Sequence, residues 1–247
     1  MQQQMQSNKK RVVFIKMNKI RKMENVMKYN IAIDGPAGAG KSTIAKELAK
    51  RLGYIYVDTG AMYRAMALYF LRLGFAATDQ VAIAGACQKV KVAIEYKDGM
   101  QQVILNGKNV TSFLREEAVG RMASAISIYP EVRLKLVELQ RELAKTNDVI
   151  MDGRDIGTYV LPDADIKIYL TASVKARADR RYLELKEKGI KSDYDEIKRD
   201  MEERDERDKN REFAPLRQAE DAVLIDSSNQ NIEEVINSIL AIKENTK

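Results

Sequence analysis

The sequence contains no histidine and no tryptophan, and it has only one cysteine and four prolines among 247 residues. Without histidine, a histidine general base, a Ser-His-Asp triad and histidine metal ligands are all excluded. The lone Cys87 excludes an internal disulfide and a cysteine-cluster metal site, and it favours a reducing, cytoplasmic setting. No apolar run approaches the roughly 18 residues that cross a bilayer, so no membrane segment is predicted.

The positive charge of the chain is concentrated at its beginning. Residues 1–30 carry eight Lys/Arg and one acid, a net charge of +7, whereas the whole chain carries +6 and the remainder therefore −1. We predict no nucleic-acid-binding surface on the globular body. We interpret residues 1–28 as a basic, disordered or loosely helical extension. A targeting segment and an artefact of the chosen start are alternatives, because Met17, Met23 and Met27 are also candidate starts.

The most informative stretch is IAIDGPAGAGKST, residues 31–43. A short apolar run predicts a buried strand, and the pattern Gly-x-x-x-x-Gly-Lys-Ser follows it directly. Glycines let backbone N–H groups turn inward and hold phosphate oxygens. Apolar residues at 44, 48 and 52 then predict an amphipathic helix whose N-terminus faces the phosphates. A chance glycine-rich turn is the alternative, but the strand–loop–helix context disfavours it. The predicted phosphate site consists of Gly35, Pro36, Ala37, Gly38, Ala39, Gly40, Lys41, Ser42 and Thr43.

Three side chains suit a magnesium nucleotide. Lys41 can place its charge against the β- and γ-phosphates, and the Ser42 hydroxyl can ligate Mg²⁺. Residues 149–151 predict a buried strand that ends at Asp152, where a carboxylate can hold Mg²⁺ directly or through water.

The residues after Asp152 also carry polar groups. Gly153, Arg154 and Asp155 turn out of the predicted sheet. Arg154 can bind a phosphate, and Asp155 can accept hydrogen bonds from a polar ligand. An ordinary turn with a local ion pair is the alternative, and the presence of the glycine-rich loop favours the functional interpretation.

Strands alternate with helices along most of the chain, which predicts an α/β fold with a parallel sheet of about five strands flanked by helices. The expected strands are 30–33, 54–57, 148–151, 165–170 and 222–225. Residues 90–105 differ, because apolar and polar side chains alternate there around the hairpin signal Asp98-Gly99. They predict a small inserted antiparallel sheet, whose face serves either core packing or a substrate wall, with packing favoured.

Two arginines lie on helices that follow or precede predicted strands. Arg64 sits one turn into the helix after Asp58-Thr59-Gly60, where it can reach an anion or remain a solvated surface side chain. The buried side of this helix is predicted to comprise Ala65, Leu68, Tyr69 and Leu71. Residues 116–146 predict a helix broken near Tyr129-Pro130, and Arg133 lies one residue from the apolar stripe of its second piece.

Residues 192–213 predict a highly charged helix on which Arg204, Asp208 and Arg211 share one face. A solvated helix explains some of these charges, through pairs such as Glu203–Arg207 and Asp205–Lys209. A mobile arginine-bearing lid also explains why two arginine-rich helices follow a nucleotide-binding core. Phosphoryl transfer needs positioning and charge neutralisation more than acid–base chemistry, which suits a chain without histidine.

Taken together, the motifs resemble the bacterial cytidylate kinase family. The resemblance rests on GPAGAGKST, VDTGAMYR, SAISIYPEVR, MDGRDIGTYVLPDADIKIYLTAS and RDERDKNREFAPL, which follow in order from about residue 29. It implies a P-loop NTPase fold and one nucleoside-monophosphate kinase domain over residues 29–247. Its expected parts are a core (29–75, 147–176 and 214–247), an inserted NMP-binding part (76–146) and a helical lid (177–213).

The resemblance also implies a reaction, the transfer of phosphate from ATP to CMP or dCMP with Mg²⁺, in pyrimidine nucleotide metabolism. Residues 35–43 would bind the ATP phosphates, with Ser42 and Asp152 at the metal. Thr59, Arg204 and Asp208 would meet the sugar; Arg64, Arg154 and Arg211 the acceptor phosphate; Ser124, Arg133 and Asp155 the pyrimidine edge. The expected catalytic residues are Lys41, Asp152, Arg154 and Arg211. Thr59 stands where the family often has serine, which leaves the preference between ribose and deoxyribose open.

We expect a monomer whose partners are small nucleotides, with no membrane. Three other functions remain as alternatives: a P-loop small-molecule or nucleoside-monophosphate kinase with a different acceptor, a nucleic-acid-binding module that uses the basic extension, and a regulatory NTPase that hydrolyses ATP without an acceptor.

Overall fold

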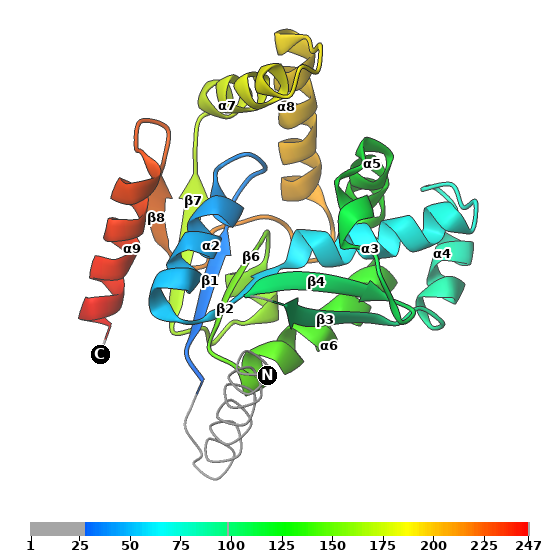
Figure 1. Ribbon diagram of the computed structural model, residues 1–247, viewed down its shortest axis with the longest axis horizontal. Coiled ribbons are helices and arrows are strands. Elements are labelled where there is room, and N and C mark those ends of the chain that lie inside the picture. Colours follow the sequence, from blue (N-terminus) through cyan, green and yellow to red (C-terminus); the bar gives the residue numbers. More distant parts are fainter. Residues whose placement is uncertain (1–27, 98, 247) are drawn as a thin grey trace, which may run out of the picture.

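The structure, a computed structural model, describes residues 28–97 and 99–246. Its central sheet contains five parallel strands in the order β2-β6-β1-β7-β8 (Figure 1). The strands are β1 (Asn30–Asp34), β2 (Ile55–Asp58), β6 (Val149–Gly153), β7 (Ile166–Thr171) and β8 (Val223–Asp226). Their bounds agree with the predicted ranges to within two residues, so the expected α/β sheet is confirmed. The basic extension lies outside the described residues, except for its last residue.

The strand order places acidic strand ends beside one another. β6 lies between β2 and β1, although it follows them in the sequence by about ninety residues or more. In the register, Asp58 of β2 is opposite Asp152 of β6, and Asp34 of β1 is opposite Gly153. Because the carboxyl ends of parallel strands meet at one edge of a sheet, the loops that follow these strands gather at the same edge.

Helices cover both faces of the sheet, and alternation along β1 assigns its side chains to them. Ile31 and Ile33 pack in a core cluster with α2 (Lys41–Leu52) and α9 (Ile232–Asn245). Ala32 belongs to the cluster on the opposite face. The helices that contribute to this cluster are α3 (Thr59–Arg72), α4 (Gln80–Cys87), α5 (Glu117–Ile126) and α6 (Pro130–Thr146). The predicted break before Pro130 is confirmed, since Pro130 opens α6.

Between α3 and α5 the chain inserts a small subdomain. It comprises α4 (Gln80–Cys87), β3 (Val92–Lys97), β4 (Met100–Leu105), β5 (Lys108–Asn109) and the short helix η1 (Thr111–Arg115). The antiparallel pairing of β3, β4 and β5 confirms the predicted sheet. Val103 and Leu105 are buried in the same core cluster as α3. The Tyr96 hydroxyl donates to the Tyr56 carbonyl at 3.0 Å, and the sheet therefore serves core packing.

Two charged helices, α7 (Val174–Glu187) and α8 (Tyr194–Asn210), stand beyond the carboxyl edge of the sheet (Figure 1). The predicted pairs along α8 are wrong. Asp205 accepts a hydrogen bond of 2.6 Å from Arg177 of α7 rather than pairing with Lys209. Arg207 Nε donates to the Glu203 carbonyl oxygen at 3.4 Å rather than to its carboxylate. Asp205 is buried against a neighbouring helix, where a guanidinium is available that local spacing does not reveal.

The remaining prediction for α3 is partly wrong. Leu71 was expected on the buried side but is 37% exposed. The buried residues Met62, Met66 and Phe70 recur every four positions, and Leu71 lies one position beyond this stripe, rotated toward solvent.

The short helix η2 (Ile156–Val160) follows β6 and completes the elements near the carboxyl edge. Within residues 28–97 and 99–246, no helix combines the length and the apolar character needed to cross a membrane.

Candidate active site

A cavity of about 220 Å³ opens at the carboxyl edge of the sheet. It lies among the loops after β1, β2 and β6 and the helices α5 and α8. The predicted site residues that line it are Ala37, Gly38, Lys41, Ser42, Thr59, Arg64, Ser124, Arg133, Asp152, Arg154, Asp155, Arg204, Asp208 and Arg211. The predicted residues that do not line it are Gly35, Pro36, Ala39, Gly40 and Thr43, all from the glycine-rich loop.

The glycine-rich loop packs closely against the sheet before it turns into α2. Gly35 has a φ of +147°, and a Cβ built on it would lie 1.9 Å from the Leu170 carbonyl oxygen, so no other residue fits there. α2 begins at Lys41, and both Lys41 and Ser42 line the cavity. The free N–H groups at the N-terminus of α2 therefore lie at the cavity edge. The buried Lys41 ammonium donates to the Pro36 carbonyl at 2.7 Å. Burial, and then the neighbouring Arg154 guanidinium, hold the pKa of Lys41 well below its usual value.

Asp152 is held from two sides at the tip of β6. Ser42 Oγ donates to one carboxylate oxygen at 2.8 Å, and the Tyr56 hydroxyl donates to the other at 2.9 Å. Burial, and then the charge of Asp58, raise the pKa of Asp152. Among the described residues there is no cluster of three or more acidic, His or Cys side chains that could enclose a metal ion. One carboxylate and one hydroxyl still fit Mg²⁺, which keeps several waters and takes further ligands from substrate phosphates.

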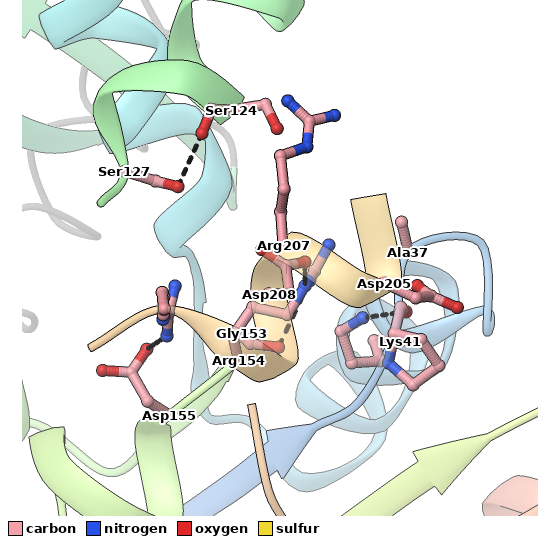
Figure 2. Close-up of polar contacts among 12 residues, drawn as sticks. Ala37, Lys41, Ser124, Ser127, Gly153, Arg154, Asp155, Asp205, Arg207 and Asp208 are labelled. Atoms are coloured by element: carbon pink, nitrogen blue, oxygen red, sulfur yellow. Dashed lines mark hydrogen bonds and ion pairs between the residues drawn. The ribbon is translucent and has the colours of Figure 1, made fainter. Parts of the chain in front are cut away.

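On the opposite side of the cavity, Asp155 joins two arginines. It forms buried ion pairs with Arg133 of α6 and with Arg211, which follows α8, and the Arg211 Nη2 distance is 3.1 Å. Arg133 is only 1% exposed and also donates to the Ser127 carbonyl at 3.0 Å. Figure 2 shows Ser124 and Ser127 on the α5 side of the site, with Asp155 facing it from the β6 loop. Polar groups from α5, α6, the loop after β6 and the segment after α8 therefore surround one corner of the cavity.

Positive charge is in excess in this cavity. Its lining contains six Lys/Arg and four Asp side chains. Arg154 Nε donates a hydrogen bond of 2.8 Å to the Asp208 carboxylate, and Figure 2 shows this contact. Burial, and then the charge of Arg154, lower the pKa of the Arg204 guanidinium to about 10. The buried Nε atoms of Arg133 and Arg204 have no hydrogen-bond partner within the described part of the chain. Donors and excess charge of this kind suit an anionic ligand with several acceptor oxygens.

The comparison with known proteins agrees with this geometry. The sequence pattern of the family described as cytidylate kinase matches residues 31–245. The chain belongs to the cytidylate kinase family. The cytidylate kinase of Caldicellulosiruptor saccharolyticus is 53% identical over 215 residues, which are 87% of this chain and 95% of that relative. The cytidylate kinase of Desulfitobacterium hafniense is 52% identical over 218 residues, 87% of this chain and 94% of that relative. Both the resemblance seen in the motifs and the expected P-loop kinase fold are confirmed.

Thr59, which the motif resemblance assigned to the sugar, is buried at the cavity edge. Its Oγ1 donates to the Asp152 backbone carbonyl at 2.7 Å. Because a hydroxyl has one proton to donate, Thr59 can only accept a hydrogen bond from a ligand while this contact persists.

Sequence reasoning missed several polar residues of this site. Asp58 lines the cavity and caps α3, accepting from the Ala61 N–H at 2.9 Å. Its position at a strand end was a usable signal. Tyr63 also lines the cavity, and burial raises its pKa to about 12. Ser127 enters only because α5 ends beside Arg133, and nothing in its local sequence indicates this.

Asp34 was also missed, although it begins the glycine-rich loop. Its carboxylate accepts hydrogen bonds from the backbone N–H groups of Ile156 at 2.8 Å and Gly157 at 2.7 Å. These residues directly follow Asp155. The Asp34 carboxylate therefore holds the backbone that presents Asp155 to the cavity.

Proposed function

We propose that this member of the cytidylate kinase family transfers the γ-phosphoryl group of ATP to CMP and dCMP, giving CDP and dCDP. One observation carries the proposal. A single cavity is lined by Lys41 of the glycine-rich loop together with five arginines, which are Arg64, Arg133, Arg154, Arg204 and Arg211. Two phosphorylated ligands that meet in this cavity fit that lining, because cationic donors are available to both.

The donor side is assigned to the loop of residues 35–43. Its backbone N–H groups and the N-terminus of α2 would bind the ATP phosphates, and Lys41 would neutralise their charge. Ser42 and Asp152 would hold Mg²⁺, which neutralises charge on the transferring phosphates when it is bound. The hydrogen bonds of Ser42 and Tyr56 to Asp152 support this assignment, since they fix both carboxylate oxygens.

The acceptor phosphate is assigned to Arg64, Arg154 and Arg211. Guanidinium groups bind phosphate oxygens through paired N–H groups, and several of them around one phosphoryl group stabilise its charge during in-line transfer. We assign Arg154 and Arg211, with Lys41 and Asp152, to catalysis. The sugar would contact Thr59, Arg204 and Asp208, and all three line the cavity.

The base is assigned to the corner formed by Ser124, Arg133 and Asp155. Cytosine presents an amino group that donates, next to ring acceptors. The Asp155 carboxylate can accept from that amino group, while Arg133 and the Ser124 hydroxyl can donate to the acceptors. Uracil presents a carbonyl oxygen where cytosine has its amino group, and that oxygen would face a carboxylate. Asp155 therefore supports preference for cytosine.

We propose that residues 177–213 act as the lid and that residues 76–146 form the part that binds the nucleoside monophosphate. Closure of α7 and α8 over the cavity would exclude water, which would otherwise accept the phosphoryl group. One chain supplies all the lining residues named above, so a monomer suffices for the reaction.

The proposal is tested by supplying the purified full chain with ATP, Mg²⁺ and a panel of nucleoside monophosphates. CMP and dCMP are expected to give the highest kcat/KM, and ADP release without an acceptor should be negligible. Faster turnover of another acceptor would support the alternative kinase function. Equal ADP release with and without CMP would instead support a regulatory NTPase.

A further inference from the structure

Arg177 joins three segments that are far apart in the sequence. It lies in the first turn of α7 and is 3% exposed. Its Nε donates to the Ala172 carbonyl at 3.0 Å, its Nη1 to the Ala37 carbonyl at 2.9 Å, and its Nη2 to Asp205 Oδ2 at 2.6 Å. One guanidinium therefore ties the end of β7 to the glycine-rich loop and to α8.

The bond to Ala37 fixes a peptide of the phosphate loop. A peptide is planar and trans, so its C=O and the following N–H point in opposite directions. Arg177 holds the Ala37 carbonyl from outside the cavity, because Ala37 and Gly38 line the cavity and Arg177 does not. The Gly38 N–H is thereby turned toward the cavity, where donor phosphates are expected. The side chains of Arg177 and Met201 also pack within 3.4 Å of a Cβ placed on Gly38.

The same guanidinium also connects the loop to α8. Asp205 is buried, and it is three residues before Asp208, which pairs with Arg154. α8 therefore contacts the donor loop through Arg177 and the β6 loop through Arg154. Figure 2 shows Asp205 close to the segment that carries Ala37 and Lys41, on the side of α8 away from Asp155.

We propose that Arg177 is a positioning residue of the donor site. It orients the Ala37–Gly38 peptide for phosphate binding, and through Asp205 it makes that orientation depend on the position of α8. Arg177 acts through the loop backbone and does not itself contact the acceptor. This inference rests on the proposed function to the extent that ATP is taken as the phosphoryl donor.

The variants separate orientation from simple charge loss. Arg177→Met removes all three hydrogen bonds but leaves Asp205 buried without its partner, so this variant alone can fail to fold. Arg177→Met combined with Asp205→Asn restores neutrality and still lacks the bond to Ala37. Arg177→Lys retains the charge, but an ammonium lacks the planar fork that reaches three acceptors. Arg217→Met is the control, since Arg217 is exposed and lies outside the proposed lid.

The first measurement is the Kd of each full-length variant for a non-hydrolysable ATP analogue and, separately, for CMP, by isothermal titration calorimetry. The second is steady-state kinetics, which gives the KM for each nucleotide and kcat. For the neutral double variant we expect the Kd and KM of the donor to rise about 10- to 100-fold, as for lost hydrogen bonds to a charged group. We expect CMP affinity to change less than about 3-fold, Arg177→Lys to give an intermediate donor effect, and Arg217→Met to behave as wild type.

Three results would overturn the inference. One is a folded double variant that binds the ATP analogue as tightly as wild type. Another is an equal loss of affinity for donor and acceptor, which would mean that Arg177 acts only as a general structural contact. The third is that no Arg177 variant folds, whereas Asp205→Asn, which loosens the link to α8, does fold and leaves donor affinity unchanged.

If the wild-type protein prefers an acceptor other than CMP, that acceptor replaces CMP in these measurements. The proposed function then fails, while the donor measurement still decides the role of Arg177.

Discussion

The Ser42 hydroxyl donates a hydrogen bond of 2.8 Å to the Asp152 carboxylate, joining the first turn of α2 to the tip of β6. The two residues are 110 positions apart in the sequence. Tyr56 of β2 donates to the other carboxylate oxygen, so three elements of the nucleotide-binding core fix a single acid. A carboxylate held in this way keeps its orientation toward the phosphate loop without relying on a ligand.

Asp152→Asn should lower kcat by at least about 100-fold, because the substitution removes a preorganised charge from the site of phosphoryl transfer. The dependence of rate on Mg²⁺ concentration should shift to higher concentrations in the same variant. Steady-state kinetics across a Mg²⁺ titration measures both effects. Asp163→Asn, at an exposed position, is the control and should match wild type. Retained Mg²⁺ dependence and kcat in Asp152→Asn would remove this residue from the metal site.

Asp155→Ala should weaken both specificity and stability. Without the carboxylate, the ratio of CMP to UMP turnover should fall toward one, because no acceptor remains for the cytosine amino group. A panel assay with both nucleotides measures this ratio. An unchanged ratio would move base recognition elsewhere in the cavity.

The same substitution leaves two buried arginines, Arg133 and Arg211, without the carboxylate with which both form ion pairs. The free energy of unfolding should fall by about 3–5 kcal/mol, as found when one partner of a buried pair is removed. Urea denaturation measures it. Arg133→Met combined with Asp155→Leu removes one of the two unpaired charges and should recover part of that loss, while Arg211 remains without its partner. If the double variant were as unstable as Asp155→Ala, the unpaired charge of Arg133 would not be the cause.

Asp34 should make stability depend on pH. Burial raises its pKa from the usual 3.8 to about 7 in the folded protein, and backbone N–H groups of Gly157 and Ile156 oppose this only in part. Between these values the folded protein binds more protons than the unfolded chain. The contribution of Asp34 to the free energy of unfolding is therefore greatest below about pH 4 and falls as pH rises to about 7, by up to about 1.4 kcal/mol per pH unit.

Comparing wild type with Asp34→Asn isolates this contribution. The difference in free energy of unfolding, wild type minus variant, should be more positive at pH 5 than at pH 8, because only the wild type carries the titrating group. Denaturation curves at several pH values measure it, with Asp163→Asn as the control. A difference that is the same at both pH values would show that Asp34 does not titrate in this range.

Gly35→Ala should destabilise the protein by roughly 3–5 kcal/mol, because the added Cβ meets a backbone carbonyl and the φ of +147° is strained for alanine. Gly53→Ala is the matched control at the end of α2. Its φ is +70°, but no heavy atom lies within 4 Å of the added Cβ, so a cost of roughly 1 kcal/mol is expected. Thermal or urea unfolding distinguishes the two. Equal costs at both positions would mean that the loop moves away from β7 to accommodate alanine.

Local patterns predicted the elements well where one period dominated. The strands of the parallel sheet were found because buried runs of β-branched residues are bounded by turn signals. The stripe on α3 was placed wrongly at Leu71, since nearly every position of this helix is apolar and the period is weak there. The ion pairs along α8 were predicted wrongly for a related reason. Spacing indicates which charges on one helix lie near one another, but it does not indicate what a second helix offers to them.

The sequence alone determined the glycine-rich loop, the alternation of strands and helices and the motifs of the family, because each depends on residues within a few positions of one another. Only the tertiary structure decided that β6 lies between β2 and β1, and that Arg133 meets Asp155. It also decided that Arg177 holds a carbonyl 140 positions away. Such contacts follow from the packing of whole elements onto both faces of the sheet, and backbone preferences that act over one or two turns carry no information about them.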